Sequence, residues 1–146
     1  MNLEIYNMTI LDLNSIKETL SSDFDDFWSY SILQSELENP NSEYFVAKTD
    51  NEIVGFAGIW KSIDDVHITD IVVKKSHRKM HIGSALLQKL IDTAQYQNFK
   101  SITLEVNENN LPAINLYSKF LFKKLGIRKK YYNNKDNAII MTKFFE

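Results

Sequence analysis

The stretch that decides the fold is IVVKKSHRKMHIGSALLQKLID, residues 71–92. It begins with β-branched residues typical of a strand and ends in a helical pattern. Between them, six of eight positions are basic or imidazole side chains: Lys74, Lys75, His77, Arg78, Lys79 and His81. A strand that turns directly into a helix leaves the first N–H groups of the helix unpaired beyond the strand's end. These donors, the helix dipole and the basic loop together favour an anion, above all a phosphate.

Gly83 supports this interpretation, because a residue without a Cβ lets the backbone come close to a ligand. The segment is not a nucleoside-triphosphate loop, since G-x-x-x-x-G-K-S/T is absent, and it is not a G-x-G-x-x-G dinucleotide fingerprint. The alternative is a basic loop that faces solvent. From the residues alone, both readings stay open.

The residues that follow predict a strand–helix–strand unit. Apolar side chains at helical spacing form one stripe, made of Leu86, Leu87, Leu90, Ile91 and Ala94. The helix is expected to end before Asn98, and SITLEV, residues 101–106, reads as the next strand. Two strands joined through a helix are expected to run parallel.

The segments before this unit predict two helices and three strands. Residues 3–6 form a first strand, and a helix over residues 10–20 is capped by Thr9 or Asp12. Ser29 caps a second helix, which ends near Asn39 because Pro40 follows. The runs EYFVAK and IVGFAGIW flank the turn TDNE and read as a hairpin, and VHITDIVV reads as a further strand.

The C-terminal segments predict a helix from about Leu111, with Pro112 suited to its first turn. GIRKKYY and AIIMTKFF then form a closing hairpin around NNKDN. The order of elements indicates a mixed α/β sheet. With 146 residues, few glycines and prolines, and no repeat or linker, we expect a single domain, residues 1–146.

Composition excludes several classes of function. There is no cysteine, so disulfides, a thiol nucleophile and a cysteine-ligated metal are excluded. The N-terminal segment has no apolar core typical of a signal peptide, and the longest apolar run, residues 53–60, is far too short to span a membrane. We therefore expect a cytoplasmic protein without a membrane partner.

Charge is divided unevenly along the chain. Residues 1–65 hold 13 acidic and 3 basic side chains, whereas residues 66–146 hold 6 acidic and 14 basic ones. Such a division suggests that one half meets an anion and the other a cation, or it reflects a solvated surface with uneven charge. The basic segment at 74–81 carries no stacking aromatic side chain, so we expect no nucleic-acid partner.

The stretch VVKKSHRKMHIGSALLQKLI, residues 72–91, resembles the signature of the GNAT superfamily of N-acetyltransferases. In that family a strand ends in a Q/R-x-x-G-x-G/A loop that holds the pyrophosphate of acetyl-CoA. The pattern falls here on residues 78–83, with Gly83 at its last position. His81 replaces the first glycine, where its side chain either crowds the pyrophosphate or adds a donor.

The second half of the chain is similar to the RimI-type ribosomal-protein-alanine N-acetyltransferases. The resemblance is carried by Leu104-Glu105-Val106, Asn110, Ala113, Leu116-Tyr117, Arg128, Tyr131-Tyr132, Ala138 and Met141, and by Phe27, Trp28 and Ser29 in the first half. Two residues depart from the pattern. Leu121 stands where a glycine is expected, and Asn137 stands where an acid is common.

The resemblance implies the GNAT fold, a mixed and mostly antiparallel sheet of about seven strands with about four helices and a parallel, splayed pair in its middle. It implies Glu105 as general base, Tyr117 as general acid and a backbone N–H within 71–73 as oxyanion donor. The acetyl-CoA contacts it implies are Ile71, Val72, Val73, Arg78, Lys79, Met80, His81, Ile82, Gly83, Ser84, Asn110 and Tyr117.

Each implied role has a plainer alternative. Glu105 reads equally as a surface carboxylate at a strand end, and Tyr117 as a half-buried helix tyrosine. Tyr131 and Tyr132 either line an acceptor groove or alternate across a strand. Asp25, Asp26, Phe27 and Trp28 are expected to receive a basic N-terminus of the acceptor. His77 and His81 are four apart and share one face if that segment is helical, but no further ligands accompany them, so we expect no metal.

We therefore expect an enzyme that moves an acetyl group from acetyl-CoA to a primary amine, most of all to the N-terminal α-amine of a ribosomal or other protein. A small-molecule amine such as a polyamine, and a non-catalytic CoA-binding regulatory module, are the alternatives. The sequence is compatible with a monomer or a dimer.

Overall fold

The computed structural model describes residues 2–24, 29–132 and 134–145. Its centre is a seven-stranded sheet with the strand order β1-β2-β3-β4-β5-β7-β6. Neighbouring strands are antiparallel except β4 and β5, which are parallel. The strands are β1 (Leu3–Asn7), β2 (Ser42–Thr49), β3 (Glu52–Lys61), β4 (Asp65–Val73), β5 (Ser101–Asn107), β6 (Lys123–Tyr132) and β7 (Asp136–Phe144).

Four α-helices and three short helical turns accompany the sheet. They are α1 (Ile10–Ser15), η1 (Lys17–Thr19), η2 (Leu20–Phe24), α2 (Tyr30–Glu38), η3 (Lys75–His77), α3 (Ile82–Tyr96) and α4 (Leu111–Lys119). This architecture confirms the fold class predicted from the sequence. Within the described ranges, no helix is long and apolar enough to cross a membrane.

The N-terminal helix is shorter than the apolar spacing predicts. Thr9 caps α1 in a capping box with Asp12, so both candidate caps take part. The α-helix ends at Ser15, and the chain continues through a 3-10 turn and a π-helical turn up to Phe24. The prediction of one continuous helix over residues 10–20 is therefore wrong, because the α-helix is followed by 3-10 and π-helical turns. Leu13 and Leu20 are nevertheless buried, as expected.

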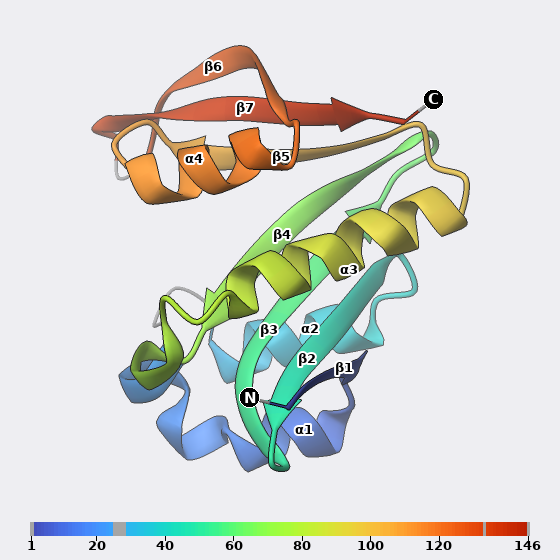
Figure 1. Cartoon of the computed structure of the whole chain (residues 1–146), viewed down its shortest axis with the longest axis vertical. Helices are drawn as coiled ribbons and strands as arrows, with labels where there is room; N and C mark the ends of the chain where they lie inside the picture. Colours follow the sequence, from blue (N-terminus) through green and yellow to red (C-terminus); the bar gives the residue numbers. More distant parts are fainter. Residues whose placement is uncertain (1, 25–28, 133, 146) are drawn as a thin grey trace.

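The parallel pair in the middle of the sheet opens after three residues. β4 pairs with β5 only over residues 65–67 and 101–103, and the last pair is His67 with Thr103. In Figure 1 the two strands meet at the upper right and diverge toward the left, with β5–β7 and α4 above and β1–β4 below. The splayed pair inferred from the family resemblance is confirmed, and the strand edges beyond residues 67 and 103 are free to meet a ligand.

Two apolar clusters cover the two faces of the sheet. The larger one contains the buried stripe of α3, which is the stripe expected from the sequence, and the helix lies in front of the sheet in Figure 1. The smaller one joins α1, η2 and α2 to the opposite face, with Phe24 and Phe56 in ring contact at 5.8 Å. Burial on both faces fixes the direction in which β4 and its loop leave the sheet.

The end of α4 explains the departure at Leu121. Leu121 has a φ of 71°, the left-handed conformation that glycine adopts most easily. The N–H of Leu121 donates to the carbonyl of Ser118 at 3.0 Å, and the N–H of Phe122 donates to the carbonyl of Tyr117 at 3.0 Å. This pair of hydrogen bonds is the Schellman pattern. The Tyr117 and Phe122 rings pack 5.9 Å apart, so the motif also fixes the last turn of the helix that carries Tyr117.

Candidate active site

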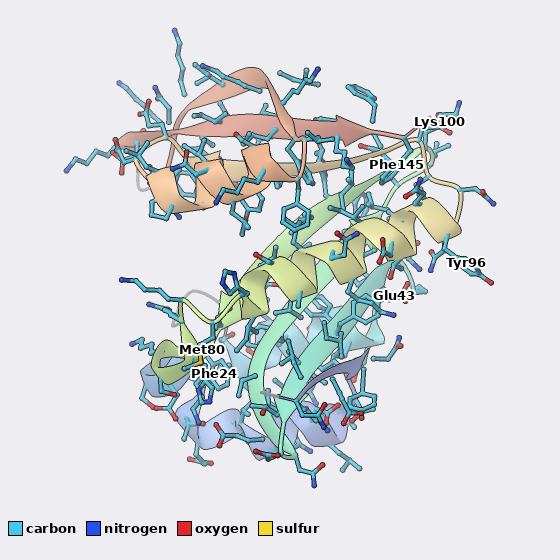
Figure 2. The ribbon with its side chains drawn as sticks, in the orientation of Figure 1. Phe24, Glu43, Met80, Tyr96, Lys100 and Phe145 are labelled. Carbon is cyan, nitrogen blue, oxygen red and sulfur yellow. The ribbon has the colours of Figure 1, made fainter. Side chains whose placement is uncertain are left out.

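The cavity at the end of β4, called here the cradle cavity, has a volume of about 570 Å³. It is lined by the end of β4, the following loop, the first turn of α3 and one face of α4. Of the residues expected to contact acetyl-CoA, Met80 alone does not line it. Met80 is 46% exposed and lies in the region of Phe24 at the lower left of Figure 2. The lining also includes His77, Pro112, Ala113 and Leu116, which the sequence did not assign to the site.

The loop between β4 and α3 turns twice through left-handed backbone. Lys79 and His81 both have a φ of 64°, and His81 occupies the N-cap position of α3 without a side-chain cap. His81 therefore adopts the left-handed conformation that glycine adopts most easily, and it takes part in lining the cavity. His77 ends the separate turn η3, so the expectation that His77 and His81 share a helix face is wrong. Among the described residues, no group of three or more His, Asp or Glu could hold a metal.

Gly83 leaves open space at the start of α3. A Cβ added there would meet only the Cγ2 of Val73, at 3.8 Å, which is ordinary contact. Packing within the protein therefore does not require glycine at this position. The space belongs to the cradle cavity, and the approach of a phosphate to the helix start stays a prediction.

The N–H groups of Ile71 and Val73 point toward the gap that opens between β4 and β5. The N–H of Lys74 donates to the carbonyl of Val54 on β3 at 2.8 Å. Because N–H groups alternate sides along a strand, those of Ile71 and Val73 point away from β3. β5 has diverged at this level, since its pairing with β4 ends at His67. These donors suit an extended ligand or a developing oxyanion.

The cradle cavity is positively charged. Arg78, Lys79, His77 and His81 line it, and none of its described lining residues is an Asp or Glu. Arg78 also donates to the carbonyl of Phe24 at 3.5 Å, which links the loop to η2. The nearest carboxylate contact, Glu52, pairs with Lys74 at 2.9 Å and lies 4.0 Å from the His77 Nε2. Charge and backbone donors together match a pyrophosphate.

A second hollow, called here the Glu105 cavity, lies on the other side of the divergence and has a volume of about 260 Å³. Three strands line it, with residues 67–69 from β4, 104–105 from β5 and 131–132 from β6. Glu105 stands two residues beyond the last β4–β5 pair, where the strands have separated. The structure thus brings together Glu105, Tyr131 and Tyr132, which the sequence could group only through the family resemblance.

Arg128 is the charged neighbour of Glu105. Its Nη1 lies 3.4 Å from the Glu105 Oε2, and the Glu105 side chain is 23% exposed. The guanidinium also lies 4.9 Å from the ring centroid of Tyr131, which in turn packs edge-on against Tyr132 at 5.0 Å. Glu105 and the two tyrosine rings therefore line the Glu105 cavity, and the Arg128 guanidinium lies against both the carboxylate and the Tyr131 ring.

Tyr117 lies on the side of the cradle cavity, on α4. The pKa of Tyr117 is raised to about 12, chiefly by burial and to a smaller extent by the neighbouring Tyr132. Burial, then Glu105 and Tyr131, also raise the pKa of Tyr132. Both hydroxyls therefore keep their protons near neutral pH, the state that a proton donor needs.

A bulge in β4 shapes the Glu105 cavity, and no local pattern in the sequence predicts it. The pairing with β3 shifts between Gly58 and Ile59, which leaves Thr69 as an extra residue on β4. The Thr69 hydroxyl lies 2.9 Å from that of the buried Tyr44, whose ring occupies the space where a Cβ on Gly58 would stand. Burial and the neighbouring Asp70 raise the pKa of Tyr44. Tyr44, which packs against Gly58, thereby holds Thr69 in the wall of the Glu105 cavity.

The predicted acceptor contacts Asp25, Asp26, Phe27 and Trp28 lie outside the described residues, so their part in the site stays a prediction. The described residues on either side of them are Phe24, which is buried, and Ser29, whose hydroxyl accepts from the N–H of Ile32 and caps α2 as expected.

Comparison with known proteins agrees with this geometry. The model of the acetyltransferase (GNAT) family matches residues 11–122. The chain belongs to this family, and it is an acyl-CoA-dependent N-acetyltransferase whose cosubstrate is acetyl-CoA.

Among its relatives is a Bacillus subtilis (strain 168) protein named "Putative ribosomal protein bS18-alanine N-acetyltransferase", which is 34% identical over 94% of this chain and 92% of its own. An N-alpha-acetyltransferase of Sulfurisphaera tokodaii is 27% identical over 94% of this chain and 90% of its own. The crystal structure of the Escherichia coli ribosomal-protein-S18-alanine N-acetyltransferase superposes with a TM-score of 0.87 at 26% identity, covering 97% of this chain and 92% of that one. The resemblance to the RimI-type enzymes is confirmed.

Proposed function

We propose that this protein acetylates the N-terminal α-amine of a protein, with Glu105 as general base and Tyr117 as general acid. The observation that carries the proposal is the placement of the two cavities. The positively charged cradle cavity, with Tyr117, and the Glu105 cavity lie on the two sides of the β4–β5 divergence. A thioester held in the first cavity and an amine entering the second would meet between the separated strands.

The chemistry needs no covalent enzyme intermediate. A protein α-amine has a pKa of about 8, so a useful fraction is neutral near pH 7. As its nitrogen attacks the thioester carbonyl, the new C–N bond forms and Glu105 accepts the amine proton, directly or through a water. The N–H groups of Ile71 and Val73 face the place where the oxyanion develops.

Collapse of the tetrahedral intermediate breaks the C–S bond. Tyr117 then donates its proton to the departing thiolate, whose ordinary pKa lies near that of a cysteine thiol, about 8.5. Glu105 returns its proton to solvent and Tyr117 regains one, which restores the starting state. Arg78, Lys79, His81, Ser84 and the start of α3 bind the pyrophosphate during the cycle.

A protein N-terminus is the leading acceptor for two reasons. Relatives over nearly the whole chain carry the names of protein N-terminal acetyltransferases. The Glu105 cavity is walled by aromatic rings that can cover a first side chain, with Tyr131 47% exposed. Asp25, Asp26, Phe27 and Trp28 are proposed as further contacts. An acceptor of this kind agrees with the cytoplasmic location expected from the sequence.

A mass-spectrometric acetylation screen tests the proposal. The purified protein and acetyl-CoA are offered peptides with free α-amines, the same peptides with blocked α-amines, and polyamines. We expect an added acetyl group on the free α-amine alone. Transfer only to polyamines would replace the protein acceptor by a small amine, and binding of acetyl-CoA without any transfer would identify a regulatory module.

A further inference from the structure

Arg128 forms an ion pair with the carboxylate that is proposed to act as the base. Within the described part of the chain, it forms the one ion pair of Glu105, with 3.4 Å between Nη1 and Oε2. Oε2 is enclosed and accepts no hydrogen bond from a described residue. An incoming amine would therefore meet the other oxygen, Oε1, while Oε2 stays against the guanidinium.

The backbone around Arg128 is irregular and held in place. Arg128 pairs with Ala138 and Tyr132 with Asp136, so three residues of β6 stand opposite one residue of β7. The side-chain Oδ1 of that residue, Asn137, accepts from the N–H of Lys130 at 2.9 Å. The amide also donates from Nδ2 toward Glu108 at 3.5 Å.

This irregularity accounts for the departure from the family pattern at Asn137. An aspartate there would accept the Lys130 N–H equally well, but it would set a second carboxylate against Glu108. The backbone N–H of Asn137 donates to the Glu108 Oε2 at 3.0 Å, so the contact is part of the turn. Asn137 thus stabilises the widened strand that aims Arg128 at Glu105.

We propose that Arg128 is a positioning residue of the transfer reaction, an inference that rests on the proposed function. Its guanidinium lies 3.4 Å from Oε2 and so holds one oxygen of the half-buried Glu105 carboxylate in place. Its contact with Oε2 fixes which oxygen faces the acceptor. Its stacking on Tyr131 ties the orientation of the base to the aromatic wall of the same cavity.

A purely structural ion pair would behave differently. The Arg128 side chain is 54% exposed, and ion pairs of that exposure contribute little to stability. Loss of the contact should therefore lower kcat far more than it lowers the melting temperature, because the carboxylate would no longer hold one orientation toward the amine. The KM for acetyl-CoA should not change, since Arg128 does not line the cradle cavity.

The variants Arg128→Met and Arg128→Lys separate the two possibilities, with Lys124→Met as the matched control. Lys124 lies on the same strand and is exposed, and it forms no ion pair with a described residue. For Arg128→Met we expect kcat to fall by about tenfold, with the KM for acetyl-CoA and the melting temperature unchanged. Arg128→Lys should restore much of the lost kcat, and Lys124→Met should match the wild type.

An unchanged kcat in Arg128→Met, or no recovery of kcat in Arg128→Lys, would overturn the positioning role. A second measurement does not depend on turnover. The carbon-13 chemical shift of the Glu105 carboxyl, observed in the protein without ligands, should differ between Arg128→Met and the wild type but not between Lys124→Met and the wild type. Equal chemical shifts in all three proteins would refute the inference even if the enzyme acetylates N-termini, whereas a changed chemical shift in a protein that transfers no acetyl group would refute the proposed function alone.

Discussion

The cradle cavity and the Glu105 cavity are built in opposite ways. The cradle cavity takes most of its lining from one stretch, residues 71–84, with α4 as its other wall. The Glu105 cavity takes its lining from three separate strands and depends on a bulge in β4 and a widened β6. The first uses backbone N–H groups and general positive charge, whereas the second uses particular side chains. Conservative changes should therefore affect the Glu105 cavity more severely.

The largest expected effect comes from Glu105→Gln. Loss of the general base should lower kcat by about 100- to 10,000-fold, while acetyl-CoA binding stays intact because Glu105 does not line the cradle cavity. Rates measured across pH should recover in part at high pH, where more of the amine is neutral. Asp64→Asn, which alters an exposed carboxylate, is the control. A rate within a few-fold of the wild type would remove Glu105 from the mechanism.

Gly83→Leu tests the binding of acetyl-CoA in the cradle cavity, whereas Glu105→Gln tests catalysis. At 100 times its dissociation constant, acetyl-CoA should stabilise the wild type by about 2.7 kcal/mol, and the leucine should abolish this gain by filling the approach of the phosphate. Thermal unfolding with and without acetyl-CoA measures the effect. Gly126→Leu is matched, since a Cβ there also meets its nearest neighbour, Ile140, at 3.8 Å. Equal stabilisation of both variants by acetyl-CoA would place the cosubstrate elsewhere.

The buried Tyr117 of the cradle cavity predicts a loss of stability at alkaline pH. An unfolded tyrosine ionises near pH 10, whereas the raised pKa of Tyr117, about 12, keeps it protonated in the folded state. The free energy of unfolding should thus fall as pH rises from 10 to 12, by about 2 kcal/mol from this residue. Denaturant unfolding of Tyr117→Phe should lack this part of the decline. The exposed Tyr96, changed to Phe, provides the comparison.

The smallest effects are expected at Leu121 and His81. Both have left-handed backbone and stand where the family resemblance predicts glycine. Leu121→Gly should raise the free energy of unfolding by about 0.5 to 1 kcal/mol, because the relief of left-handed strain exceeds the entropy cost of glycine. Acetyl-CoA affinity should not change, since Leu121 does not line the cradle cavity. His81→Gly should give a similar gain and also change the affinity. If Leu121→Gly and His81→Gly changed the affinity for acetyl-CoA equally, the two residues would not have separate roles.

The sequence predicted the fold largely through periodicity and end signals. The stripe of α3, the caps at Thr9 and Ser29, and the parallel unit around 71–106 follow from local spacing. It also placed nearly every residue of the cradle cavity, since a strand end, a basic loop and a helix start lie next to one another in the chain. Met80 was the exception, because the direction of a loop side chain depends on its neighbours.

The composition of the Glu105 cavity, by contrast, follows only from the tertiary structure. The family resemblance singled out Glu105, Tyr131 and Tyr132, but no local pattern shows that Thr69 bulges from β4 over Tyr44 and Gly58, or that Arg128 reaches Glu105. These contacts join residues 14 to 25 positions apart in the chain and depend on strand register. A shift of register by one residue turns every side chain to the opposite face. Local sequence therefore determined the cradle cavity, where the cosubstrate is proposed to bind, whereas the pairing of distant strands decided what surrounds Glu105, the proposed base.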